Sequence, residues 1–172
     1  MSRYPEASIE LITAAQEDEE QFVALYQMYS KRVFQFVLSR TADVQLAEDL
    51  TQETFISVLR KLHTYTPGNA AFSSWLFTIA LNHIRMYFRK HTIKTVDITE
   101  LAHALPADTE HHIEWLDIAS ALQRLSVKDQ ELLRMKYLDD LSNKDIAEIL
   151  DISPNKCGVQ IHRALKRLQK YV

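Results

Sequence analysis

The scarcity of glycine restricts the fold of this sequence more than any other feature, because the 172-residue chain contains only two glycines. Prolines are also few, at four. Folds made of β-strands reverse the chain at many tight turns, and such turns are rich in both residue types. Gly158 even stands within a stretch of helical periodicity, where glycine costs about 1 kcal/mol relative to alanine. The sequence therefore predicts an all-α fold.

Apolar residues recur every three or four positions along three N-terminal segments, and each segment is therefore predicted to be a helix. These helices cover about residues 22–37, 45–62 and 73–91. Residues 92–112 lose the periodicity and are interpreted as a linker, whereas residues 113–172 hold four further candidate helices. We therefore predict two small helical domains joined by a linker, with boundaries at 1–20 (an acidic N-terminal segment), 21–91, 92–112 (an acidic linker) and 113–172.

Capping residues mark the helix starts in the second domain. Ser126 and Asp129, and again Ser142 and Asp145, have the spacing of a capping box, and Ser153 is suited to cap the last helix. The last two helices, within residues 142–168, are separated by a three-residue break, which is helix-turn-helix spacing. Asp151 lies in this break, and aspartate tolerates left-handed backbone better than most residues.

The outward face of the last helix is rich in basic and amide side chains, which can reach phosphates and base edges in a major groove. Its members are Asn155, Lys156, Val159, Gln160, Arg163, Lys166, Arg167 and Lys170. Residues 152–172 carry five bases and no acid, although the net charge of the chain is −3. The helix dipole accounts for some of these bases. An ordinary helical hairpin with a solvated polar face is the alternative interpretation.

A second candidate surface is the outer face of the helix over residues 47–62. It presents Glu48, Asp49, Gln52, Glu53, Ile56 and Arg60. Acids near the start and bases near the end also suit the helix dipole, which is the alternative explanation. However, Ile56 is apolar in the middle of a charged face, and this pattern indicates a protein-docking surface.

A third candidate surface combines a basic helix face with an aromatic loop. Thr78, Asn82, Arg85 and Arg89 follow one another at helical spacing. Aromatic residues beside basic ones indicate stacking on unpaired bases, and the preceding loop supplies Tyr65, Asn69, Phe72 and Trp75. The alternative is that Phe72 and Trp75 belong to the core, which we expect for Trp75.

Other functions find little support in the sequence. We expect no membrane insertion, because no run of 18 apolar residues exists. The single cysteine, Cys157, cannot form an internal disulfide, so we expect a cytoplasmic protein. Glu100 and His103 have the spacing of half a di-iron ligand pair, but that design requires two such pairs on long helices. We expect no cofactor, no metal and no catalytic residue.

Together, three segments resemble bacterial extracytoplasmic-function (ECF) sigma factors. They read "AEDLTQETFISVLRKL", "FSSWLFTIALNHIRMYFRK" and "ALQRLSVKDQELLRMKYLDDLSNKDIAEILDISPNKCGVQIHRALKRL". The resemblance covers roughly residues 20–91 and 113–170. It implies that residues 21–91 form sigma region 2, which binds the β′ clamp helices of core RNA polymerase and opens the −10 element. Residues 113–172 would form sigma region 4, which reads the −35 element and lies at the β flap.

The resemblance also implies roles for individual residues and partners. Contacts to β′ would come from Asp49, Gln52, Glu53 and Ile56. The −10 DNA would be bound by Tyr65, Asn69, Phe72, Asn82, Arg85 and Arg89, with a flipped base held in the loop. The −35 DNA would be bound by Ser153, Asn155, Lys156, Val159, Gln160, His162, Arg163, Lys166 and Arg167. A cognate anti-sigma factor is expected as a further partner. A DNA-binding regulator outside the polymerase is the competing hypothesis, but it leaves the first two helix faces of residues 47–91 unexplained.

Gly158 is where the sequence departs from the family pattern. The recognition helix of the family commonly has a valine, a base, a small polar residue and a second base where this chain has Cys157, Gly158, Val159 and Gln160. One interpretation is that Gly158 lets the backbone approach DNA, with Val159 against a thymine methyl group. The other, which we favour, is weakened or altered −35 recognition, because phosphate contacts are lost.

Overall fold

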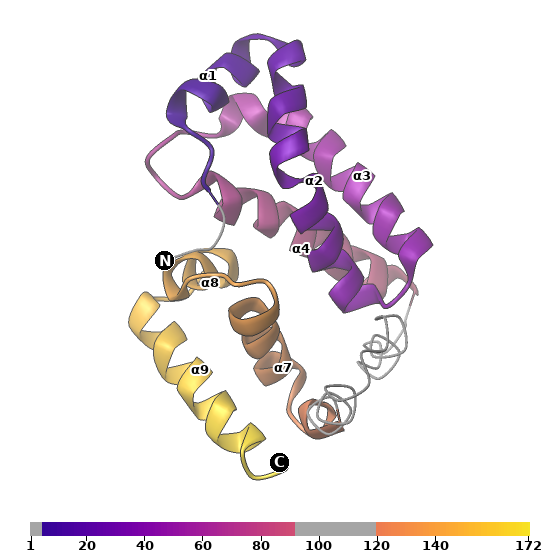
Figure 1. The fold of residues 1–172 in the computed structure, drawn as a ribbon, viewed down its shortest axis with the longest axis vertical. Coiled ribbons are helices and arrows are strands. Elements are labelled where there is room, and N and C mark those ends of the chain that lie inside the picture. The colour runs from indigo at the N-terminus through magenta and orange to yellow at the C-terminus, as the bar shows by residue number, and fades with distance from the viewer. Residues whose placement is uncertain (1–4, 92–119) are drawn as a thin grey trace.

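The computed structural model describes residues 5–91 and 120–172, and all regular secondary structure within these ranges is helical (Figure 1). The all-α prediction is therefore confirmed. The predicted acidic linker over residues 92–112, with Glu100 and His103, lies outside the described residues, as does most of the helix expected over 113–125. Only its final turn, from residue 120, is described.

The N-terminal domain consists of α1 (Ile9–Glu17), α2 (Glu19–Thr41), α3 (Val44–Lys61), the short 3₁₀ helix η1 (Leu62–Thr64) and α4 (Phe72–His91). The three predicted helices are present as α2, α3 and α4. Helix α2 begins earlier than expected, because the Asp18 side chain caps it by accepting a hydrogen bond from the Glu20 amide.

Helix α1 differs from the expectation, which places only an acidic segment over residues 1–20. It begins at an N-cap, Ser8, whose hydroxyl accepts from the Leu11 amide at 3.2 Å. Ile12 and Ala15 are its buried residues. Their three-residue separation is the signal that could have identified α1, although it spans less than one full turn.

The C-terminal domain contains α7 (Val127–Leu133), a π-helical turn η2 (Arg134–Leu138), α8 (Asn143–Leu150) and α9 (Pro154–Leu168). Ser142 and Asp145 form the complete capping box that their spacing predicts. At α7 only half of the predicted box forms. The Ser126 hydroxyl caps the helix, but the Asp129 carboxylate instead accepts from Arg167 of α9.

One continuous hydrophobic core joins the two domains. In the N-terminal domain it contains Tyr29 and Phe72, whose ring centroids lie 5.5 Å apart. The same core takes in Ile146 and Ile149 of α8, and α8 lies against α4 in Figure 1. A smaller cluster packs within the C-terminal domain, formed by Leu122, Leu125, Leu133 and Ala164. The structure therefore places the domains in contact, an arrangement that the sequence left open.

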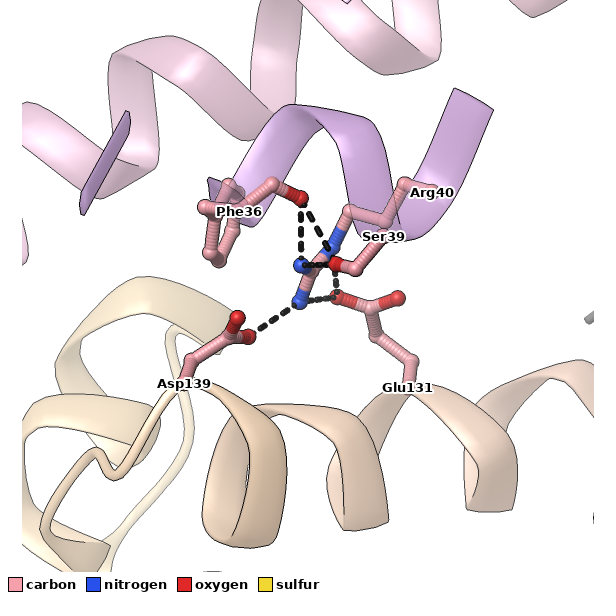
Figure 2. A network of polar contacts seen from close by, with 5 residues as sticks. All are labelled: Phe36, Ser39, Arg40, Glu131 and Asp139. Atoms are coloured by element: carbon pink, nitrogen blue, oxygen red, sulfur yellow. Dashed lines mark hydrogen bonds and ion pairs between the residues drawn. The ribbon is translucent and has the colours of Figure 1, made fainter. Parts of the chain in front are cut away.

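A buried polar network crosses the same interface (Figure 2). Arg40 of α2 donates hydrogen bonds to Glu131 of α7 at 3.0 and 2.9 Å and to Asp139 at 2.8 Å. Its guanidinium also donates to the Phe36 carbonyl of its own helix and to the Ser39 hydroxyl. The network fixes the rotation of one domain relative to the other, because each hydrogen bond that Arg40 donates has a defined direction.

Candidate functional site

The helix-turn-helix is formed by α8, a short turn and α9, as the spacing predicts. Helix α8 ends at Asp151, which adopts the left-handed conformation (φ 53°, ψ 52°) expected of a residue in this position. The next amide, that of Ile152, donates to the Ala147 carbonyl at 2.9 Å and closes the turn. The turn therefore sets the angle between the two helices through backbone bonds.

Helix α9 is divided into a buried and an exposed face. Cys157, Ile161 and Ala164 are buried, and burial raises the pKa of the Cys157 thiol, so this thiol packs as an apolar group. The exposed face carries most of the residues predicted to bind DNA, namely Asn155, Lys156, Val159, His162, Arg163 and Lys166. A convex, basic helix face of this kind can enter a major groove.

Three other residues predicted to bind DNA from this face make contacts within the protein, or have a half-buried side chain. The Ser153 hydroxyl caps α9 by accepting from the Lys156 amide. Gln160 is half-buried, and its buried Oε1 has no hydrogen-bond partner. The Nη1 of Arg167 donates to both carboxylate oxygens of Asp129, at 2.9 and 2.8 Å. Arg167 is exposed, but this pair also ties α9 to α7.

Gly158 lies at the junction of α8 and α9 rather than in the middle of the exposed face. It is half-buried, and a Cβ placed on it would lie 3.6 Å from Nδ2 of Asn143, the first residue of α8. This is ordinary van der Waals contact. No tertiary clash therefore requires glycine here.

The outer face of α3 presents the four residues expected to bind protein. Asp49, Gln52 and Glu53 are exposed, and Ile56 keeps 49% of its surface accessible among them. Helix α4 supports this face, which no local pattern in the sequence indicates. His83 of α4 contacts Glu53 through Nδ1 at 3.4 Å and Ser57 through Nε2 at 2.9 Å. A histidine between two helix faces could be recognised only after their packing was known.

Helix α4 presents Asn82, Arg85 and Arg89 to solvent, so the basic face expected there is accessible. The aromatic loop before α4 is arranged differently from the expectation.

The Tyr65 and Phe72 rings are buried and pack edge to face at 5.4 Å, and the Tyr65 hydroxyl donates to the Ala70 carbonyl at 2.7 Å. Trp75 packs against both rings, in agreement with its expected core role. Both rings therefore belong to the core in this structure, and of the loop residues expected to bind −10 DNA only Asn69 is exposed.

Comparison with known proteins assigns the two helical units to one family. Residues 25–93 match the family model for Sigma-70 region 2, and residues 115–168 match the model for Sigma-70, region 4. The ECF RNA polymerase sigma factor SigM of Bacillus subtilis is 33% identical over 150 residues, which covers 84% of this chain and 91% of SigM.

Solved structures share the fold. CnrH, in complex with the cytosolic domain of CnrY, superposes with a TM-score of 0.70 at 22% identity, covering 94% of each chain. The sigma factor RpoE of Bartonella quintana, in complex with the anti-sigma factor NepR, gives a TM-score of 0.69 at 22% identity, covering 88% of this chain and 96% of RpoE.

The chain belongs to the sigma-70 family, among its ECF sigma factors. It is therefore a transcription factor that directs core RNA polymerase to promoter DNA, as the resemblance had implied. Within the two described ranges, no helix combines the length and apolar character that crossing a bilayer requires.

Proposed function

We propose that the two domains divide promoter recognition between them and that residues 21–91 act as region 2 and residues 113–172 as region 4. The observation that carries this proposal is that separate, exposed faces on α3, α4 and α9 each combine the chemistry required by one target. The α3 face is acidic with an apolar centre, whereas the α4 and α9 faces are basic.

The face on α9 binds the −35 element in this proposal. Asn155, Lys156 and Arg163 are exposed along one side of the helix, where they can reach base edges and phosphates. Val159 offers the apolar contact that suits a thymine methyl group. Arg167 contributes less to binding than Lys166, because its guanidinium is already held by Asp129.

The face on α3 binds the β′ clamp helices, with Ile56 as its apolar centre and Asp49, Gln52 and Glu53 around it. An apolar side chain within a polar rim is the usual anatomy of a protein interface. The face on α4 follows the −10 DNA through Asn82, Arg85 and Arg89. Asn69 contributes from the loop, whereas Tyr65 and Phe72 would reach a flipped base only if the loop opened.

Control by a cognate anti-sigma factor is part of the proposal, since RpoE of B. quintana, which shares this fold, was solved with one. We further propose that the protein acts in the cytoplasm, has no catalytic residue of its own and supplies recognition to the polymerase, which performs the chemistry.

The test is transcription in vitro with bacterial core RNA polymerase on fragmented genomic DNA, with sequencing of the RNA 5′ ends. Discrete start sites that require this protein are expected, with shared sequence upstream at two positions. Absence of start sites together with absence of binding to core polymerase would overturn the proposal and leave a DNA-binding regulator.

A matched pair of variants tests the α3 face. Ile56→Glu places a charge at the centre of the proposed interface and is expected to weaken binding to core polymerase at least tenfold, because a desolvated charge would be unpaired. Ile9→Glu changes an isoleucine of similar exposure on α1 and is expected to bind as the wild type does. Equal binding by both variants would contradict the assignment.

A further inference from the structure

A cavity of about 630 Å³ opens between the two domains, and apart from Arg85 and Gln160 its described lining lies outside the faces assigned to DNA and polymerase. Its apolar wall comes from both sides of the interface: Leu81, Ile84 and Phe88 of α4, Val127 of α7, and Leu150 and Ile152 around the helix-turn-helix turn. Small-molecule sites commonly have volumes of about 300–1,000 Å³ with mainly apolar linings and occur where domains meet. The cavity fits this description.

Arg134 of η2 lines the same cavity and is buried. Its exposed fraction is 8%, and its Nε has no hydrogen-bond partner. Among the residues that the structure describes, no carboxylate lies within ion-pair distance of this guanidinium. Burial, together with repulsion from Arg40, lowers the pKa of Arg134, although the carboxylates of Glu131 and Asp139 act in the opposite direction. A buried cation that lacks a direct ion pair is only partly compensated, so an anion placed beside it would be stabilised.

The charges on the rest of the cavity wall also favour an anion. Arg85 and Lys128 also line the cavity, and neither forms an ion pair with a described residue. The single acidic residue among the described lining residues, Glu131, is engaged by Arg40. The described lining thus combines an apolar wall with an excess of positive charge, since it holds Arg40, Arg85, Lys128 and Arg134 but only one acid, Glu131.

We propose that this cavity binds a small amphipathic anion, an apolar chain that carries one carboxylate. The chain lies against the apolar wall between α4 and α7, and the carboxylate pairs with Arg134. The volume of the cavity lies within the range that is common for small-molecule sites. The proposal is independent of promoter recognition, because its test uses neither polymerase nor DNA.

The experiment is calorimetric titration of the full chain with sodium decanoate below its micelle concentration, compared with decanol, which has the same chain and no charge. Saturable binding of decanoate is expected, at least tenfold tighter than binding of decanol, since hydrogen bonds to a charged group are the strong ones. Amide chemical shifts measured by NMR are expected to change at Ile84 and Val127. Equal affinity for decanol, or no binding of decanoate, would overturn the proposal.

Variants locate the site. Arg134→Met is expected to weaken decanoate binding at least tenfold, whereas Arg60→Met, on exposed α3 surface, is expected to leave it unchanged. Val127→Asp adds an acid to the rim at the start of α7, where aspartate suits the helix, and is expected to weaken binding similarly.

The uncharged control at that position, Val127→Asn, is expected to retain most of the affinity. Wild-type affinity in both Arg134→Met and Val127→Asp would overturn the assignment. The proposal would also be overturned if an acidic helical peptide changed the amide chemical shifts of Ile84 and Val127 and decanoate did not.

Discussion

The guanidinium of Arg40 in the N-terminal domain lies 2.8 Å from the carboxylate of Asp139 in the C-terminal domain, and the two side chains are only 3% and 7% exposed. Glu131 pairs with the same guanidinium (Figure 2). Burial opposes the charge on Arg40, but the two carboxylates outweigh it and raise the pKa of Arg40. The interface therefore retains a charged cluster within an otherwise hydrophobic contact.

Removing the cation should destabilise the protein far more than removing a surface pair would. Arg40→Met leaves Glu131 and Asp139 without their partner, and breaking a buried pair in this way costs about 3–5 kcal/mol. The measurement is the free energy of unfolding in urea. Adding Asp139→Asn to Arg40→Met is expected to restore part of the loss, because one uncompensated carboxylate is then gone. A loss below about 1 kcal/mol in Arg40→Met would contradict this account.

Stability should fall at alkaline pH because of Tyr29. Its side chain is fully buried, its hydroxyl oxygen accepts from the Ala7 amide at 2.9 Å, and burial, helped by Glu6, raises the pKa of Tyr29 well above its ordinary value of about 10. The folded state therefore holds the proton more tightly than the unfolded state does. The contribution of this proton to the free energy of unfolding is fully present below about pH 10 and is lost as the pH rises above that value.

The free energy of unfolding of the wild type is therefore expected to decline with pH above 10, by at most about 1.4 kcal/mol per pH unit from this group. Tyr29→Phe should show a shallower decline, while exposed Tyr26 offers a control, Tyr26→Phe, that should keep the wild-type decline. Identical slopes in wild type and Tyr29→Phe would refute the assignment.

Gly158→Lys should raise non-specific affinity for DNA. A side chain can be placed there without a clash, at the junction of α8 and α9 beside the basic face. One added phosphate contact steepens the dependence of log K on log salt by roughly 0.9. Gly158→Ala supplies the same gain in helix propensity, about 1 kcal/mol, without the charge. A salt slope in Gly158→Lys equal to that of Gly158→Ala would count against the placement of Gly158 near DNA.

Ala42→Gly should stabilise the protein. Ala42 ends α2 in the left-handed conformation at φ 51°, which costs a residue with a Cβ roughly 1–2 kcal/mol. Glycine removes this strain but gains more freedom in the unfolded state, so the net gain expected is about 0.5–1 kcal/mol. Thermal unfolding of the two proteins measures it. A lower melting temperature for Ala42→Gly would show that the strain is small.

Local features of the sequence determined the helical class, the caps and the turn of the helix-turn-helix. Ser142 and Asp145 cap α8 as predicted, and Asp151 takes the left-handed turn. These features depend on residues within about four positions of one another, so their periodicity and spacing are visible in a linear sequence. The same locality made the exposed faces of α3, α4 and α9 recognisable, because a helix fixes which residues share a side.

Tertiary packing decided what those local rules leave free. Arg40 meets Glu131 and Asp139 across separations of 91 and 99 residues, and nothing near Arg40 in the sequence specifies either partner. Tyr65 and Phe72 are buried because their rings pack against each other and against Tyr29 of α2 and Trp75 of α4, whereas the sequence showed only aromatic residues near a basic helix. The sequence alone therefore determined most of the helices and the chemistry of their faces, but not α1. Only the docking of one domain on the other decided which charges are paired and which surfaces remain exposed.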